Sequence, residues 1–203
     1  MQFKYFEQPE LFSSYIDETS DCDFCNSNTK CFDASTFIGE DSIKAICGDC
    51  LAGGKLHDKD ISTCNGDITT LKQQLKKLNA ELSSQQIDQL AIEKTNELEK
   101  TTPPLISWQD WDWPAAGGDY CIFIGYGSVP LYTKLAGKAD PMKFFARSLY
   151  EKLDDPDEAE MLWDESMPEK EIKNYEESSE CSTLFYVFKS LHTNKIVTIW
   201  DED

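Results

Sequence analysis

Leucine spacing gives the clearest structural signal in the chain. Over residues 68–82 leucines recur at intervals of four, three and four, which is the apolar stripe of an amphipathic helix, and Asp67 is a suitable N-cap. Apolar residues continue a similar face from 87 to 98, after Ser83 and Ser84, until Thr101–Pro104 stops the pattern. The sequence therefore predicts either one bent helix or two helices. The residues of the stripe are Leu71, Leu75, Leu78, Leu82, Ile87, Leu90, Ala91 and Leu98.

The last hundred residues are rich in aromatic and β-branched side chains. Residues 105–132 predict a hairpin that turns at Gly117 and Gly118, because strand formers stand on both sides of the glycines. Asp140 and Pro141 are typical of a helix start, and this helix should end near residues 154–156. Two runs of strand formers, 183–191 and 195–200, then predict a closing hairpin around His192, Thr193 and Asn194.

The front of the chain has no such periodicity. Residues 1–20 begin with aromatics, Phe3, Tyr5 and Phe6, and predict an extended lead-in packed by those rings. Residues 22–66 contain several glycines typical of loops and no long helical pattern, so we expect that a metal is needed to order them. We expect an α+β protein. Its predicted segments are a loop-rich zinc-knuckle segment at 1–66, amphipathic helices at 67–102, and a segment with antiparallel hairpins and an acidic stretch at 103–203. These three segments could fold separately or form one compact unit.

Four cysteines provide the candidate metal site. Cys22 and Cys25 form one CxxC pair, Cys47 and Cys50 form a second, and twenty-one residues separate the pairs. This spacing is typical of a four-cysteine zinc site, in which each pair points two sulfurs at one ion. Four thiolates complete the tetrahedron and leave no open position, so the predicted Zn²⁺ is structural and does not activate water.

Other uses of the cysteines remain open. They could be ordinary buried or free thiols, or Cys47 and Cys50 could be a redox pair, although the Leu-Ala-Gly-Gly that follows is a poor helix start for lowering a thiol pKa. Cys31, Cys64 or His57 could replace a ligand or lie around the site. Cys121 and Cys181 have no neighbour at ligand spacing, and we expect a core residue and a strand-edge residue.

Composition narrows the classes of function. The net charge of -19 repels nucleic acids and anionic membranes and attracts basic partners. Residues 151–180 carry much of this charge, with Leu162 and Trp163 as apolar anchors, and are either a docking face for a basic protein or a solvated surface. The start lacks an export signal, no stretch approaches the ~20 apolar residues of a membrane span, and we expect a cytoplasmic protein.

The sequence contains no recognisable catalytic motif. Its histidines are His57 and His192, and HExxH, GxSxG and P-loop patterns are absent. The sequence therefore favours a protein that is not an enzyme. The aromatic cluster 108–126 could line a binding groove, but a packed core is the favoured use. The cluster consists of Trp108, Trp111, Trp113, Phe123 and Tyr126.

Several segments together resemble the CbrC family over nearly the full length. They are FKYFEQPE, the pairs CDFC and ICGDC followed by LAGGK, TTPPLISWQDWDW, GGDYCIFIG and FYVFKSLHTNKIVTIWD. The resemblance implies a bacterial immunity or tolerance factor, because the family name is tied to colicin tolerance, and it supports the four front cysteines as the metal site. Relatives tend to carry a CxxC-like turn in the last hairpin and a cysteine near 117. This chain has Ser190–Thr193 and Gly117–Gly118 at these places, which suggests that all the cysteines of a second metal site were lost together.

These observations lead to one working hypothesis and two alternatives. We expect a non-enzymatic protein with a structural zinc that acts by binding another protein, such as a basic toxin. The first alternative is a redox regulator or enzyme that uses the knuckle thiols. The second is a zinc-ribbon nucleic-acid binder, for which the front segment offers few basic residues. Those are Lys30, Lys44, Lys55 and Lys59.

Overall fold

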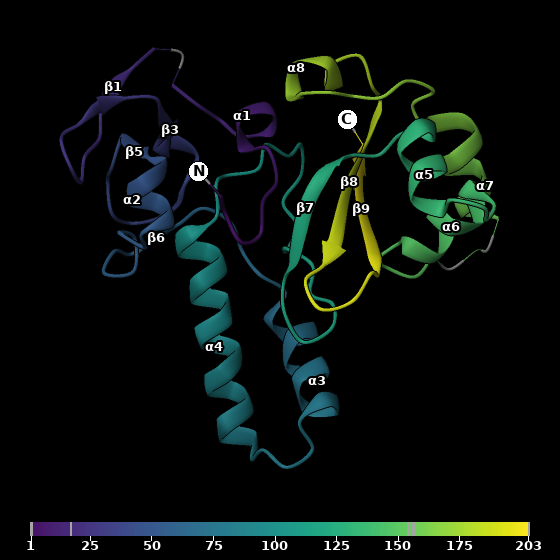
Figure 1. Cartoon of the computed structure of the whole chain (residues 1–203), viewed down its shortest axis with the longest axis horizontal. Helices are drawn as coiled ribbons and strands as arrows, with labels where there is room; N and C mark the ends of the chain where they lie inside the picture. The colour runs from purple at the N-terminus through teal and green to yellow at the C-terminus, as the bar shows by residue number, and fades with distance from the viewer. Residues whose placement is uncertain (1, 17, 154, 156, 203) are drawn as a thin grey trace.

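A computed structural model of the chain describes residues 2–16, 18–153, 155 and 157–202. It has three parts: a loop-rich cysteine-bearing part, a hairpin of two helices, and a three-stranded sheet with helices beside it (Figure 1). The prediction of an α+β fold is confirmed. The division into domains at residues 66 and 102 stays a prediction.

Short strands and turns build the cysteine-bearing part. The short helix α1 (Pro9–Phe12) comes first. Three antiparallel strand pairs follow. They are β1 (Ser20–Asp21) with β2 (Asn28–Thr29), β3 (Cys31–Asp33) with β5 (Ala45–Cys47), and β4 (Ile38–Gly39) with β6 (Ile61–Ser62). A 3-10 helix, η1 (Ala34–Thr36), and the short α2 (Gly48–Ala52) complete it. The lead-in is not wholly extended, since it contains α1, but its aromatics Phe3, Tyr5 and Phe6 are buried as predicted.

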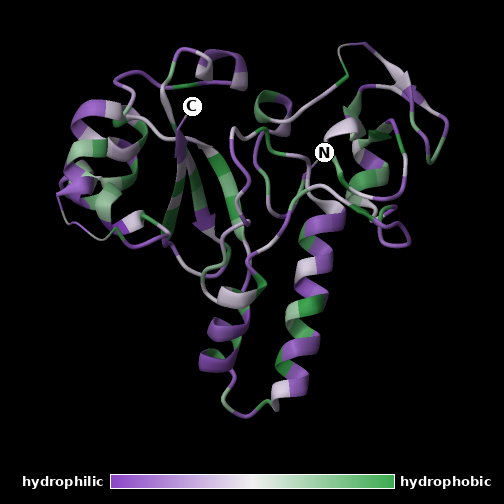
Figure 2. Ribbon diagram, turned by 180° about the vertical axis from the view of Figure 1, so that it is seen from behind, coloured by the Kyte–Doolittle hydropathy of each residue, from purple (hydrophilic) through white to green (hydrophobic). Residues whose placement is uncertain are grey.

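The amphipathic region forms two helices that lie side by side and project away from the sheet (Figure 1). Asp67 caps α3 (Ile68–Leu78) by accepting a hydrogen bond from Thr70 N at 2.8 Å. The helix ends at Leu78, before the predicted residue 82. Ser83 then opens α4 (Ser84–Thr101) with a reciprocal capping box to Gln86, which explains why the chain makes two helices. Hydrophilic and hydrophobic residues alternate along both (Figure 2).

The sheet has the order β7-β8-β9 with antiparallel neighbours. The predicted closing hairpin is confirmed: β8 (Thr183–Ser190) pairs with β9 (Ile196–Glu202) along its length. β7 (Cys121–Tyr126) adds the third strand, with an irregularity between Phe123 and Gly125.

The predicted hairpin over residues 105–132 is confirmed for β7 and for the turn at Gly117 and Gly118, but its predicted first strand is not formed. At this turn Ala115 bridges Tyr120 antiparallel, and Cys121 N donates to Pro114 O at 3.0 Å. Residues 105–113 form no strand and make only isolated bridges, because their backbone groups bond to other parts of the chain: Trp113 N donates to Asn65 O and Trp108 N to the Asp201 carboxylate. Residues 129–132, predicted as strand, instead lie in α5 (Val129–Ala136). Ser128 caps it, and a proline in its first turn suits a helix start.

Helices cover one side of the sheet, at the right of Figure 1. They are α5, α6 (Pro141–Ser148), α7 (Glu158–Met161) and the π-helical turn η2 (Leu162–Ser166); α8 (Tyr175–Ser178) lies ahead of β8. Asp140 caps α6 as predicted. The helix ends at Ser148, earlier than predicted, because the chain next bridges β9 at Leu149; residues 154 and 156 of the predicted end lie outside the described residues.

The side chains on the two faces of the sheet pack into two separate apolar clusters. The larger cluster joins one face to the lead-in, the cysteine-bearing part and the helical hairpin, and its aromatic rings meet mostly edge to face. The smaller cluster joins the other face to α5, α6 and Leu162, with Trp163 packed against it, which confirms both as apolar anchors of the acidic stretch. Trp113, Phe123 and Tyr126 are buried, so these three are core as favoured, whereas Trp108 and Trp111 are half-buried and pack against the core.

Candidate metal centre

The first cysteine pair lies in the tight turn between β1 and β2. Cys22 N donates to Ser27 O at 3.1 Å, and Asn26 N donates back to Cys22 O at 2.8 Å. Asn26 has a φ of 57°, a left-handed conformation that asparagine tolerates better than most residues. This turn holds Cys22 inside the protein and leaves Cys25 exposed.

The second pair lies where β5 becomes α2. Cys47 ends the strand and stands at the N-cap position, and Cys50 follows inside the helix. The expectation that no helix begins here is wrong, because Gly48–Ala52 is helical. This short helix turns the Cys50 side chain back toward Cys47, and both residues are buried.

Asp23 joins the two pairs. Its backbone N donates to Ala45 O at 3.0 Å, and its carboxylate accepts hydrogen bonds from Lys44 N at 2.6 Å and Ala45 N at 3.2 Å. The turn of the first pair is thereby fixed on the strand that leads into the second. The position of the four sulfurs is therefore supported by protein hydrogen bonds.

The structure brings together the sulfurs of Cys22, Cys25, Cys47 and Cys50, all within 4.8 Å of one another. Cys25 Sγ lies 3.7 Å from Cys47 Sγ, and Cys47 N donates to Cys22 Sγ at 3.3 Å. A tetrahedral zinc site with Zn–S bonds of ~2.3 Å has sulfurs about 3.8 Å apart, whereas a disulfide needs ~2.05 Å. The cysteines are free thiols, and their spacing fits a metal ion such as zinc.

The surroundings of Cys25, Cys47 and Cys50 shift their thiol pKa values in different directions. Hydrogen bonds from Ser27 lower the pKa of the exposed Cys25 to about 6. Burial raises the pKa of both Cys47 and Cys50. A cation at the centre of the four sulfurs would stabilise the thiolate form of the buried pair, since a bound metal ion deprotonates its thiol ligands.

The three other candidates are not members of the four-sulfur group, although Cys31 stands opposite Cys47 in the β3–β5 pair. Cys31 is buried in β3 and its thiol contacts Ser20 O at 3.6 Å, and Cys64 accepts from Thr63 Oγ1 at 3.8 Å. The His57 ring packs beside Gly54. Among the described residues, the group with metal-ligand geometry comprises the two CxxC pairs alone. Cys121 is buried in β7 as expected, while half-buried Cys181 precedes β8 and lies outside a strand.

The two turns predicted to have lost a second cluster are in contact. A Cβ on Gly117 would lie 3.0 Å from Ser190 Oγ and 3.4 Å from the Thr193 methyl, and Ser190 Oγ donates to Ala116 O at 2.8 Å. Hydrogen bonds hold these turns together here. That relatives carry a metal at this place stays a prediction.

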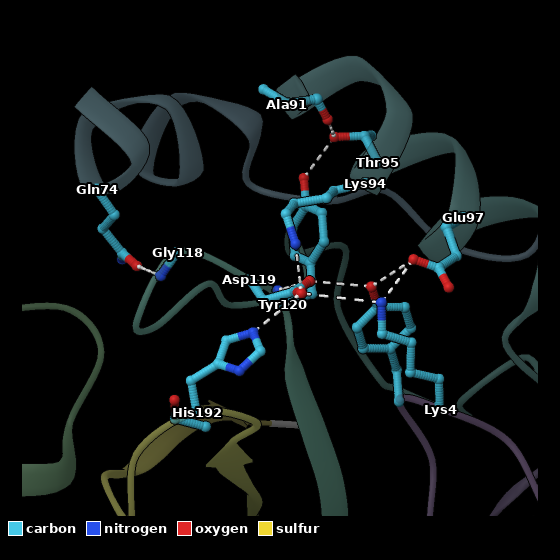
Figure 3. A network of polar contacts seen from close by, with 12 residues as sticks. Lys4, Gln74, Ala91, Lys94, Thr95, Glu97, Gly118, Asp119, Tyr120 and His192 are labelled. Carbon is cyan, nitrogen blue, oxygen red and sulfur yellow. Dashed lines mark hydrogen bonds and ion pairs between the residues drawn. The ribbon is translucent and has the colours of Figure 1, made fainter. Parts of the chain in front are cut away.

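A buried carboxylate beside these turns was missed by sequence reasoning. Asp119 is 1% exposed and binds Lys94 at 2.5 Å, the Tyr5 hydroxyl at 3.0 Å and His192 Nε2 at 3.3 Å, with Lys4 3.8 Å away (Figure 3). The residues come from the lead-in, α4, the turn before β7 and the closing hairpin. A single Asp among thirty-eight acidic residues gave no signal of this role.

Comparison with known proteins defines the class of this chain. It belongs to the uncharacterised protein family UPF0167, whose family model matches residues 1–202. No solved structure is similar enough to the chain to count as a match. The match does not extend to the CbrC name, which stays a prediction. Among the described residues, no helix combines the length and the apolar character needed to cross a bilayer.

Proposed function

We propose that Cys22, Cys25, Cys47 and Cys50 hold one structural Zn²⁺. The observation that carries this proposal is the convergence of four sulfurs within 4.8 Å, three of them from buried residues. Four thiolate ligands leave no position for substrate or water, so the ion orders the loops around it.

Metal analysis of the purified protein tests this assignment. We expect one zinc per chain by mass spectrometry, and loss of folded structure in residues 20–56 when a chelator removes it. A metal-free protein that is folded and carries a reactive thiol would overturn the structural zinc.

We further propose that the protein is not an enzyme and acts by binding a basic protein. The net charge of -19 supports this, because such a field attracts cationic surfaces and speeds their association. Within the described part of residues 151–180, no carboxylate forms an ion pair with a lysine, arginine or histidine. Their charge is thus available to a partner.

The resemblance to the CbrC family makes a toxin the partner that we propose, and an immunity or tolerance role the function. The test is a pull-down with basic toxins encoded near the gene, together with a protection assay. Absence of binding and protection with every candidate would refute the immunity role.

A matched pair of triple variants tests the docking face. Changing the exposed Glu160, Glu165 and Glu169 to Gln should slow association with the partner, and changing the exposed Glu7, Glu10 and Glu40 to Gln should have a smaller effect at equal net charge. Equal effects would show that the overall charge acts without a defined face.

A redox role is the second candidate, because Cys25 is exposed and its pKa is lowered to about 6. A low thiol pKa and access to solvent are the features of reactive cysteines. Labelling with iodoacetamide at pH 7 separates the proposals: zinc-bound protein should react slowly at all four cysteines, and a redox protein should react rapidly at Cys25.

A further inference from the structure

A second buried carboxylate, Asp201 near the end of β9, has no cation within ion-pair distance among the described residues. The residue is 2% exposed. Its Oδ2 accepts hydrogen bonds from Trp108 N at 3.2 Å, Gln109 N at 3.1 Å and the Tyr186 hydroxyl at 3.0 Å. These bonds anchor the 108–109 turn to the sheet and satisfy one oxygen.

The carboxylate of Asp201 meets no cation in the part of the chain that the structure describes. Among the described residues, Asp201 Oδ1 and Trp111 Nε1 are both buried and form no well-aligned hydrogen bond, and the Trp111 N–H lies near enough to the carboxylate to lower its pKa. No basic group of the described part lies within ion-pair distance of Asp201. Burial raises the pKa of Asp201, and the hydrogen bonds lower it by less. A buried carboxylate is normally paired with a cation, so this charge is uncompensated.

Asp201 and Trp111 both line a cavity of about 380 Å³ at the edge of β9. This volume falls in the range of small-ligand sites. The cavity wall also carries three acidic side chains and a single basic one, together with the ring of Tyr150. The charged residues are Asp110, Glu151, Glu202 and Lys152.

We propose that this cavity binds a guanidinium group, with Asp201 as its counter-ion. A guanidinium ion is more weakly hydrated than an ammonium, and it can donate to a carboxylate while its plane packs on an aromatic ring such as Trp111 or Tyr150. The inference is independent of the proposed toxin partner, since the cavity could take free arginine or an arginine side chain of a protein.

Access to the carboxylate requires one wall to move. Gln109 lines the cavity, its side chain is exposed, and its amide donates one hydrogen bond to Glu202 O at 2.7 Å. Displacing this side chain leaves the backbone bonds to Asp201 in place. The anchor of the 108–109 turn can therefore persist when the guanidinium is bound.

Titration of the full chain with N-acetyl-L-arginine amide tests the site, and the Trp111 indole N–H resonance reports on it. The resonance is assigned by its loss in Trp111→Phe. We expect a saturable shift with the arginine derivative, and at least tenfold weaker binding of the lysine and uncharged citrulline analogues. No shift of Trp111, or equal shifts with all three compounds, would overturn the proposal.

Asp201→Asn and Glu202→Gln form a matched pair of variants, because each removes one negative charge from the same wall. The amide oxygen that Asp201→Asn introduces can still accept the three hydrogen bonds now made to Oδ2, so the fold has a substitute. We expect at least tenfold weaker binding in Asp201→Asn and less than twofold in Glu202→Gln. Equal losses would show attraction by overall charge and refute the pocket. If Asp201→Asn does not fold, the three-compound comparison on the unmodified protein decides.

A peptide with one arginine between neutral residues identifies the source. Tighter binding of the peptide than of the arginine amide supports a protein ligand for this pocket, and tighter binding of free L-arginine supports a small molecule. Failure of both to bind refutes the pocket, without bearing on zinc or on the acidic docking face.

Discussion

Lys94 Nζ lies 2.5 Å from Asp119 Oδ2, and this ion pair joins α4 to the turn that leads into β7. Tyr5, Lys4 and His192 meet the same carboxylate, so the lead-in and the closing hairpin are joined to it as well (Figure 3). One buried charge thus connects four segments that are distant in sequence.

Asp119→Asn should lower the free energy of unfolding at pH 7 by about 2 kcal/mol, below the 3–5 kcal/mol of a fully buried pair, because Lys94 is partly exposed. Urea denaturation measures this value. The control is Asp88→Asn, which removes the exposed pair with Lys72 and should cost less than about 1 kcal/mol. Equal costs would contradict a special role for Asp119.

The same variant should alter the dependence of stability on pH. Burial raises the pKa of Asp119, but Lys94 and Lys4 outweigh it and hold the pKa below its usual value. A lowered pKa contributes stability above the unfolded value of ~3.9 and loses it as pH falls through the folded value. The difference between wild type and Asp119→Asn should therefore shrink below pH ~4. A constant difference would contradict the ionised pair.

Removal of one predicted ligand should release the metal. Cys50→Ser should lower the zinc content to well below one per chain and lower the melting temperature, because metal binding supplies folding free energy to the loops. Cys181→Ser, a half-buried cysteine outside the group, is the control and should keep both values. Full zinc content in Cys50→Ser would remove this residue from the ligand set.

The capping box at Ser83 should stabilise the helical hairpin. Ser83→Ala removes the bonds to Gln86 and should cost about 1 kcal/mol in urea denaturation. Ser84→Ala, one residue into the helix, should change stability by less than ~0.5 kcal/mol. A larger loss at residue 84 would show that the cap lies elsewhere.

Gly39 is confined by the backbone of the opposite strand. A Cβ at this position would lie 2.2 Å from Asp60 O, and the φ is +140°. Gly39→Ala should therefore destabilise the protein by more than Gly137→Ala, which has a φ of +62° but open space around it and should cost about 1–2 kcal/mol. Melting temperatures of the two variants compare these costs, and equal shifts would rule out the close approach as the cause.

Local patterns in the sequence were enough for the elements whose formation depends on near neighbours. The leucine stripe with Asp67, the start at Asp140 and the closing hairpin are all present, because caps, helical spacing and strand propensity act over a few residues. The spacing of the two CxxC pairs likewise predicted a group that the structure brings together.

Tertiary contacts decided the rest. Residues 105–113 have the composition of a strand, but backbone N–H groups among them donate to Asn65 and Asp201, which are far away in sequence. No pattern marks Asp119 or Asp201 among so many acidic residues, since their roles come from burial and from partners that only the fold brings near. The sequence alone thus determined α3, α4, the start of α6, the closing hairpin and the cysteine pairs, while the roles of the buried charges depend on long-range packing.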